Sequence, residues 1–106
     1  MTLVQKLVAD YARRLRERFG ARVLRVALFG SRARGEAHEE SDIDVFVLID
    51  GLTWRERVEA GELSVDAWLG HPLVIAPLVM SAAEFAHLTE MESALAADIA
   101  RDGIPA

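Results

Sequence analysis

The chain has 106 residues and a formal net charge of −5, and its 52% hydrophobic and 27% charged residues predict one folded domain over residues 1–106. The negative charge argues against extended nucleic-acid binding, and the absence of cysteine excludes disulfides and thiolate metal sites. No stretch reaches the ~20 apolar residues of a membrane span, so we expect a soluble, cytoplasmic protein.

The first half of the chain predicts a helix followed by a strand. Thr2 and Gln5 have the spacing of a capping box, which marks the start of a helix. Apolar residues then recur at helical spacing as far as Phe19, and Gly20 is placed to end the helix. The mostly apolar residues 23–29 predict a buried strand.

A glycine-containing loop leads to a second strand, which we expect over residues 42–49. Its odd-numbered residues are all apolar, whereas Asp42 and Asp44 begin the other face. Side chains alternate between the faces of a strand, so these two carboxylates point the same way, roughly 7 Å apart.

The second half of the chain predicts helix, strand and helix. Thr53 and Glu56 form a second capping box, and Gly70 is placed to end that helix. Five residues trace a face of it that we expect to pack in the core: Trp54, Val58, Gly61, Val65 and Trp68. Residues 72–80 predict a third strand, in which Pro77 indicates an edge position or a bulge.

A third capping box, Ser81 with Glu84, opens a final helical region. We expect its buried stripe to consist of Phe85, Leu88, Met91, Leu95 and Ile99. This order of elements predicts an α/β fold of the α+β two-layer kind, with a small mixed sheet and helices packed mainly on one face. The apolar surface of strand 72–80 and the last helix either belongs to the core or favours a homo-oligomer or a helical partner.

The strand aspartates and the loop before them could together hold a metal and a triphosphate. Mg²⁺ prefers oxygen ligands and is usually completed by substrate phosphates, so Asp42 and Asp44 are candidate metal ligands. Backbone N–H groups at Gly30 and Ser31 could donate hydrogen bonds to phosphate at the turn after the first strand. Alone, such a turn is usually only a turn, and a lone Asp-x-Asp is usually a solvent-facing strand start. Their combination is informative because two neighbouring carboxylates are costly to bury without a cation.

The stretch GSRARGEAHEESDID resembles the signature of minimal nucleotidyltransferases, within the DNA polymerase beta-like nucleotidyltransferase superfamily. That signature is Gly-Ser, ten residues, then Asp-x-Asp, and it is matched here without a gap. The order of the predicted elements agrees as well, so the resemblance covers nearly the whole chain and implies the nucleotidyltransferase fold.

The resemblance implies a nucleotide site and a reaction. Gly30 and Ser31 would hold the phosphates of a nucleoside triphosphate, Arg32 or Arg34 would offset their charge, and catalytic Asp42 and Asp44 would ligate Mg²⁺. Family members transfer a nucleoside monophosphate, most plausibly AMP from ATP, to an acceptor. Many such short proteins are similar to antitoxins that add AMP to a helical HEPN-domain toxin, which implies a protein hydroxyl as acceptor and a toxin–antitoxin system.

One part of the family pattern is missing. Active members carry a third carboxylate on the next core strand, but residues 71–80 contain no acid, and the corresponding position is Val74 or its neighbour Ile75. Asp66 and Glu84 flank this strand on predicted helices. Three hypotheses follow: a transferase that works with two aspartates, a catalytically weak nucleotide-binding antitoxin or scaffold, and a structural subunit of a larger nucleotidyltransferase.

The remaining candidates point to no second chemistry. The three histidines are dispersed without the spacing of a zinc site, although His38 lies in the loop over the predicted site. Trp54 and Trp68 are better explained as core residues than as base-stacking platforms, and Asp50-Gly51 is most simply a turn.

Overall fold

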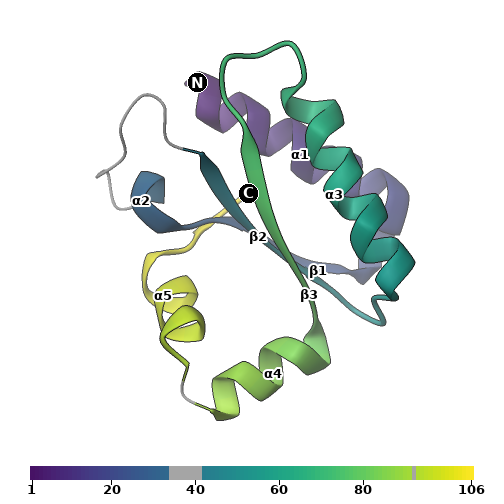
Figure 1. Ribbon diagram of the computed structural model, residues 1–106, viewed down its shortest axis with the longest axis vertical. Coiled ribbons are helices and arrows are strands. Elements are labelled where there is room, and N and C mark those ends of the chain that lie inside the picture. The colour runs from purple at the N-terminus through teal and green to yellow at the C-terminus, as the bar shows by residue number, and fades with distance from the viewer. Residues whose placement is uncertain (34–41, 92) are drawn as a thin grey trace.

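The computed structural model describes residues 1–33, 42–91 and 93–106, and its centre is a mixed sheet of four strands in the order β3-β2-β1-β4 (Figure 1). The strands are β1 (Val23–Leu28), β2 (Ile43–Ile49), β3 (Ile75–Ser81) and β4 (Ile104–Pro105). β1 is antiparallel to both β2 and β4, whereas β2 and β3 run parallel. β3 is an edge strand, so the expectation that Pro77 marks an edge is confirmed.

The two long helices, α1 (Leu3–Phe19) and α3 (Trp54–Trp68), pack side by side on one face of the sheet (Figure 1). The expected capping boxes at Thr2 and Thr53 are both present, and the short 3-10 helix η1 (Gly20–Arg22) links α1 to β1. The odd-numbered residues of β2 point into this core and are all buried. The expected α+β fold, with a small mixed sheet, is therefore confirmed.

Three shorter helices lie toward the other face: α2 (Gly30–Ala33), α4 (Ala82–Glu90) and α5 (Ala94–Asp102). Phe46 of β2 is fully buried there and meets Phe85 of α4 with a ring-centroid separation of 5.0 Å. α5 contacts α4 on one side and α2 on the other, so the chain's last helix supports the turn that follows β1.

The orientation of α3 differs from the expectation. Its buried residues are Ala60, Ser64 and Ala67, whereas Trp54 is 72% exposed and Val58 and Val65 are also exposed. Small residues at this spacing let α3 approach α1 and β3 closely, and the Tyr11 hydroxyl donates a hydrogen bond of 2.8 Å to the Ala60 carbonyl. The inward face of α3 thus combines these small residues with Leu63 and with Trp68, which packs against the core as expected.

The final helical region is also interrupted. α4 ends at Glu90, and α5 starts after Ser93, whose hydroxyl accepts from the Ala96 amide. Met91, which was expected in the buried stripe, is 64% exposed at this break. The expectation for Met91 was wrong because a second N-cap restarts the helix in a new direction.

The described residues include no helix that combines the length and the apolar character needed to cross a membrane.

Candidate functional site

Sheet topology brings the loop after β1 to the first residues of β2. Because β1 and β2 are antiparallel, the end of β1 lies beside the start of β2, with Leu28 opposite Val45. The amide of Phe29 donates a hydrogen bond of 2.9 Å to the Asp44 carbonyl, which continues this pairing up to the turn. Residues more than ten positions apart in the sequence thus become neighbours.

Asp44 lies on the face of β2 opposite the α1–α3 core. Asp42 is exposed just before the strand, and Asp44 is half-buried within it. Between them, Ile43 is fully buried on the opposite face. The expected alternation is present within β2. The next residue on the Asp44 side of the strand, Phe46, is a fully buried aromatic residue.

Gly30 lies directly against the Asp44 side chain. Its backbone has φ +71°, and a Cβ at this position would overlap the Asp44 carboxylate, lying 3.2 Å from Cγ and far inside contact distance of Oδ2. Both the left-handed backbone and the lack of space require glycine here. The turn is therefore built to bring backbone to the carboxylate, which is the geometry a shared phosphate and metal site needs.

The other loop residues predicted for the site are only partly described. Ser31 and Arg32 belong to α2, which starts at Gly30 and contacts β2 and α5, and Arg32 is half-buried. The side chain of Ser31 lies outside the described part of the structure, as do Arg34 and His38 entirely. The structure thus brings Gly30 and Asp44 together and places Ser31 and Arg32 in the same turn.

β3 flanks the aspartates with apolar residues. The Ile43 amide donates to the Val74 carbonyl at 2.8 Å, and Asp44 is paired with Ala76 in the parallel register. Val74, which is 40% exposed, and Ala76 therefore share the carboxylate face, whereas Ile75 is buried in the core on the opposite face. The position where a third carboxylate was sought thus carries valine or alanine.

The two acids that flank β3 do not replace that carboxylate. Asp66 is exposed on α3, on the core side of the sheet. Glu84 follows the far end of β3, at least five residues of strand, or about 16 Å, beyond Ala76. Arg57 and the Ser81 amide both donate hydrogen bonds to the Glu84 carboxyl and lower its pKa. These contacts explain the role of this carboxyl without a metal.

A two-carboxylate site is compatible with Mg²⁺ even so. Within residues 1–33, 42–91 and 93–106, no group of three His, Asp or Glu side chains is close enough to hold a metal. Mg²⁺, however, is usually bound through one or two carboxylates, with substrate phosphates and water as further ligands. Asp44, which lies against the Gly30 turn, and Asp42, two residues before it, could supply such a donor set.

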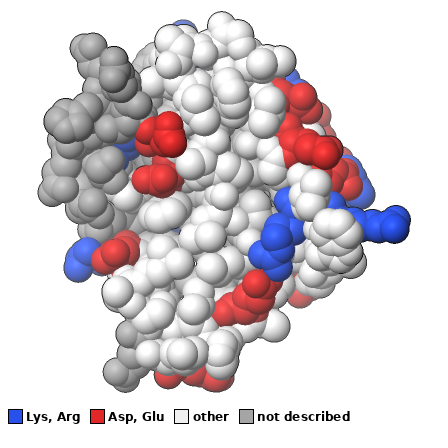
Figure 2. Space-filling model, in the orientation of Figure 1, with Lys and Arg blue, Asp and Glu red and all other residues white. Residues whose placement is uncertain are grey.

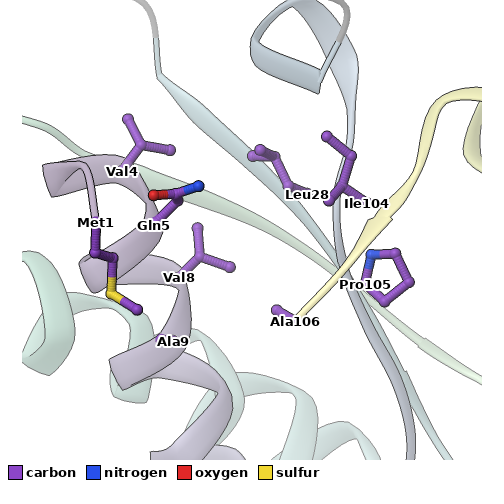
Figure 3. A pocket seen from close by; sticks show the side chains of 9 residues that line it. All are labelled: Met1, Val4, Gln5, Val8, Ala9, Leu28, Ile104, Pro105 and Ala106. Carbon is purple, nitrogen blue, oxygen red and sulfur yellow. The ribbon is translucent and has the colours of Figure 1, made fainter.

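Two cavities lie away from the aspartates. One of about 460 Å³ is mostly apolar and separates the start of α1 from Leu28 and the C-terminal residues 104–106 (Figure 3). Val4 and Val8 face Leu28 across it (Figure 3). The other, of about 410 Å³, lies between α4 and α5 beside Arg25. Neither of these two cavities is lined by Asp42 or Asp44.

Sequence reasoning missed two parts of this region. It did not foresee β4, which pairs with β1 next to the turn, or the contact of α5 with α2. β4 has only two residues and one of them is proline, so no periodic pattern in the sequence predicts this strand.

Residues 8–92 match the model of the nucleotidyltransferase domain family. The chain is 43% identical over 44 residues to protein adenylyltransferase MntA of Thermococcus cleftensis, which is 42% of each chain. It is 37% identical over 46 residues to MJ0604 of Methanocaldococcus jannaschii, which carries a provisional protein adenylyltransferase name; this is 43% of this chain and 46% of the relative. The matches thus span less than half of these relatives.

The fold has a solved counterpart. A crystal structure from Sulfolobus solfataricus, provisionally described as a nucleotidyltransferase, superposes with a TM-score of 0.62 over 96% of this chain and 78% of its own, at 20% identity. Identity this low supports the fold alone. With a family match over most of its length, this chain belongs to the nucleotidyltransferase domain family.

Proposed function

We propose that this protein is a Mg²⁺-dependent nucleotidyltransferase that moves AMP from ATP to a protein hydroxyl. One observation carries the proposal: the Gly30 turn lies directly on the Asp44 carboxylate, so phosphates held by the turn would meet metal held by the aspartates. The family of the chain and the adenylyltransferase names of its relatives support nucleotidyl transfer and AMP as the transferred group.

Each site residue has a distinct role in this reaction. The backbone of Gly30 and Ser31 would bind the triphosphate, with Arg32 and Arg34 offsetting its charge. Asp42 and Asp44 would hold the metal, which supplies charge stabilisation where the pyrophosphate leaves. The acceptor oxygen forms a bond to the α-phosphorus and releases its proton to solvent, while the bond to the pyrophosphate oxygen breaks and pyrophosphate leaves. Such transfers depend mainly on positioning and charge, which a rigid strand and a tight turn provide.

For the acceptor, we propose a tyrosine or similar hydroxyl of a helical HEPN-type toxin, with this protein as the antitoxin in the cytoplasm. This partner follows from the sequence resemblance of the GSRARGEAHEESDID segment. The exposed position of Asp42 just before β2 suits a protein acceptor, because a large substrate can approach it there.

The second candidate is a catalytically weak antitoxin or scaffold that binds nucleotide and partner without efficient transfer. It is favoured by Val74 and Ala76, which occupy the carboxylate side of β3 and can neither bind metal nor accept a proton. A third carboxylate would then have to come from the partner or the substrate.

Calorimetric titration with ATP and Mg²⁺ tests the nucleotide site first. We expect metal-dependent binding by the wild type and its loss in the Asp42→Asn/Asp44→Asn variant. Asp50→Asn is the matched control, because Asp50 is an exposed aspartate at the other end of the same strand. Absence of binding by the wild type, with the other nucleoside triphosphates as well, would overturn the nucleotide site.

Transfer and partner binding are separated by a second experiment. A HEPN-type helical protein is incubated with the wild type or with Asp44→Ala, and the added AMP is detected by its mass. The transferase proposal expects modification by the wild type only, with the complex forming in both cases. A complex without modification would favour the weak antitoxin or scaffold.

A further inference from the structure

The outer face of α3 carries an apolar stripe that the fold leaves uncovered. Trp54 is 72% exposed and Leu69, just after the helix, is 66% exposed, with exposed Val58 and Val65 between them. Large apolar side chains gathered on one solvent-facing side of a helix are typical of a protein-interaction surface. α3 is accessible because it lies at the outside of the molecule, next to edge strand β3 (Figure 1).

The stripe is symmetric along the helix about Gly61. Trp54 lies seven residues before Gly61 and Leu69 eight after, while Val58 lies three before and Val65 four after. When two such helices cross antiparallel, Trp54 of one meets Leu69 of the other and the two valines meet likewise. The stripe therefore matches itself in a two-fold arrangement, in which one patch forms both sides of the interface.

Gly61 is not explained by packing within one chain. A Cβ at this position would meet nothing within 4 Å, and glycine inside a helix is less favourable than almost any other residue. At the centre of a helix crossing, however, the missing side chain lets two backbones approach closely. Gly61, which weakens the helix, thus lies at the centre of the stripe, where a symmetric helix crossing requires a small residue.

The charges beside the stripe are complementary in the same arrangement. Arg55 lies six residues before Gly61 and Asp66 five after, on the same flank, and neither has an ion-pair partner within the described chain. In an antiparallel pair, each flank meets the same flank of the other helix, so Arg55 of each copy comes next to Asp66 of the other. Figure 2 shows acidic side chains in the upper part of the right-hand side of the molecule and basic side chains below them.

We infer that α3 is a homodimer interface, with a second copy of this chain packed antiparallel across Gly61. The helix is about 22 Å long, so a single helix pair buries less than the ~800 Å² per partner of a standard interface. The dimer therefore forms in a concentration-dependent way. The inference does not depend on the nucleotide site, which lies on the opposite face of the sheet.

Sedimentation equilibrium from about 1 µM to about 1 mM measures the dimer. We expect Trp54→Ala to raise the dissociation constant about 30-fold or more, because exposed tryptophans that become buried are typical binding hot spots. Met91→Ala is the control, since Met91 is 64% exposed and directly follows α4, at the other side of the sheet. A wild type that stays monomeric over the whole range, whether or not another protein binds α3, overturns the inference.

Two further variants test the arrangement itself. Arg55→Asp and Asp66→Arg should each weaken the dimer about threefold or more, and the double variant should restore it. Gly61→Gln should weaken the dimer and yet raise the thermal stability of the monomer, because glutamine favours a helix and has room in the single chain. A dissociation constant unchanged by Gly61→Gln, or a double variant that is not restored, excludes the antiparallel crossing.

Discussion

Replacement of Gly30 by alanine tests whether the turn is built around the Asp44 carboxylate. Two costs add at this position. The left-handed backbone at φ +71° disfavours any side chain by about 1–2 kcal/mol, and overlap with Asp44 costs a further ~1–3 kcal/mol. We therefore expect Gly30→Ala to lower the free energy of unfolding by about 2–5 kcal/mol.

The expected loss is large enough for a simple thermal measurement. A chain of 106 residues has an unfolding entropy at which each kcal/mol lowers Tm by about 4–5 °C, so Gly30→Ala should lower Tm by roughly 10–20 °C. Differential scanning calorimetry measures this change, and urea denaturation gives the free energy independently.

Gly51→Ala is the matched control. Gly51 has a similar φ of +64°, but a Cβ there would meet only the Arg22 guanidinium at 3.9 Å, an ordinary contact. Its cost should be limited to the backbone term of about 1–2 kcal/mol. In addition, most of the overlap should vanish when Gly30→Ala is combined with Asp44→Ala, which removes Oδ2. A Gly30→Ala variant no less stable than Gly51→Ala would refute the close approach of turn and carboxylate.

Two other predictions concern the pH dependence of stability and the buried tyrosine. Arg22 holds Glu56 with two hydrogen bonds of 2.7 and 2.8 Å and, together with the Thr53 amide, lowers the pKa of that carboxyl to about 2. The ion pair therefore stabilises the fold above pH 4.5, and this stabilisation is lost as the pH falls toward 2. Urea midpoints measured over this range should depend less on pH in Glu56→Gln than in the wild type. An equal pH dependence in both proteins would contradict this account. Tyr11→Phe should cost about 1 kcal/mol, seen as a lower Tm, because the hydroxyl donates to the Ala60 carbonyl. Burial raises the pKa of Tyr11, so the wild type should lose stability above pH 10 more steeply than Tyr11→Phe, and equal losses would contradict the buried hydroxyl.

The sequence by itself determined the parts of the fold that depend on neighbours in the chain. The capping boxes at Thr2, Thr53 and Ser81 were predicted and are present, because each joins a side chain to an amide three residues away. The place of Asp44 on the face of β2 opposite the core follows from strand alternation in the same way. The loop-and-aspartate motif was likewise enough to indicate the family, to which the match over residues 8–92 assigns the chain.

Tertiary structure decided which surfaces meet. α3 has an apolar face of large residues and another of small ones, and only the space between α1 and β3 selected the small face for burial. The contact of Gly30 with Asp44 required antiparallel pairing of β1 and β2, and the register of β3 placed Val74 and Ala76 rather than Ile75 beside the aspartates. These outcomes depend on contacts between distant segments, which local spacing does not encode. The same choice that buried the small face of α3 left Trp54 and its neighbours exposed.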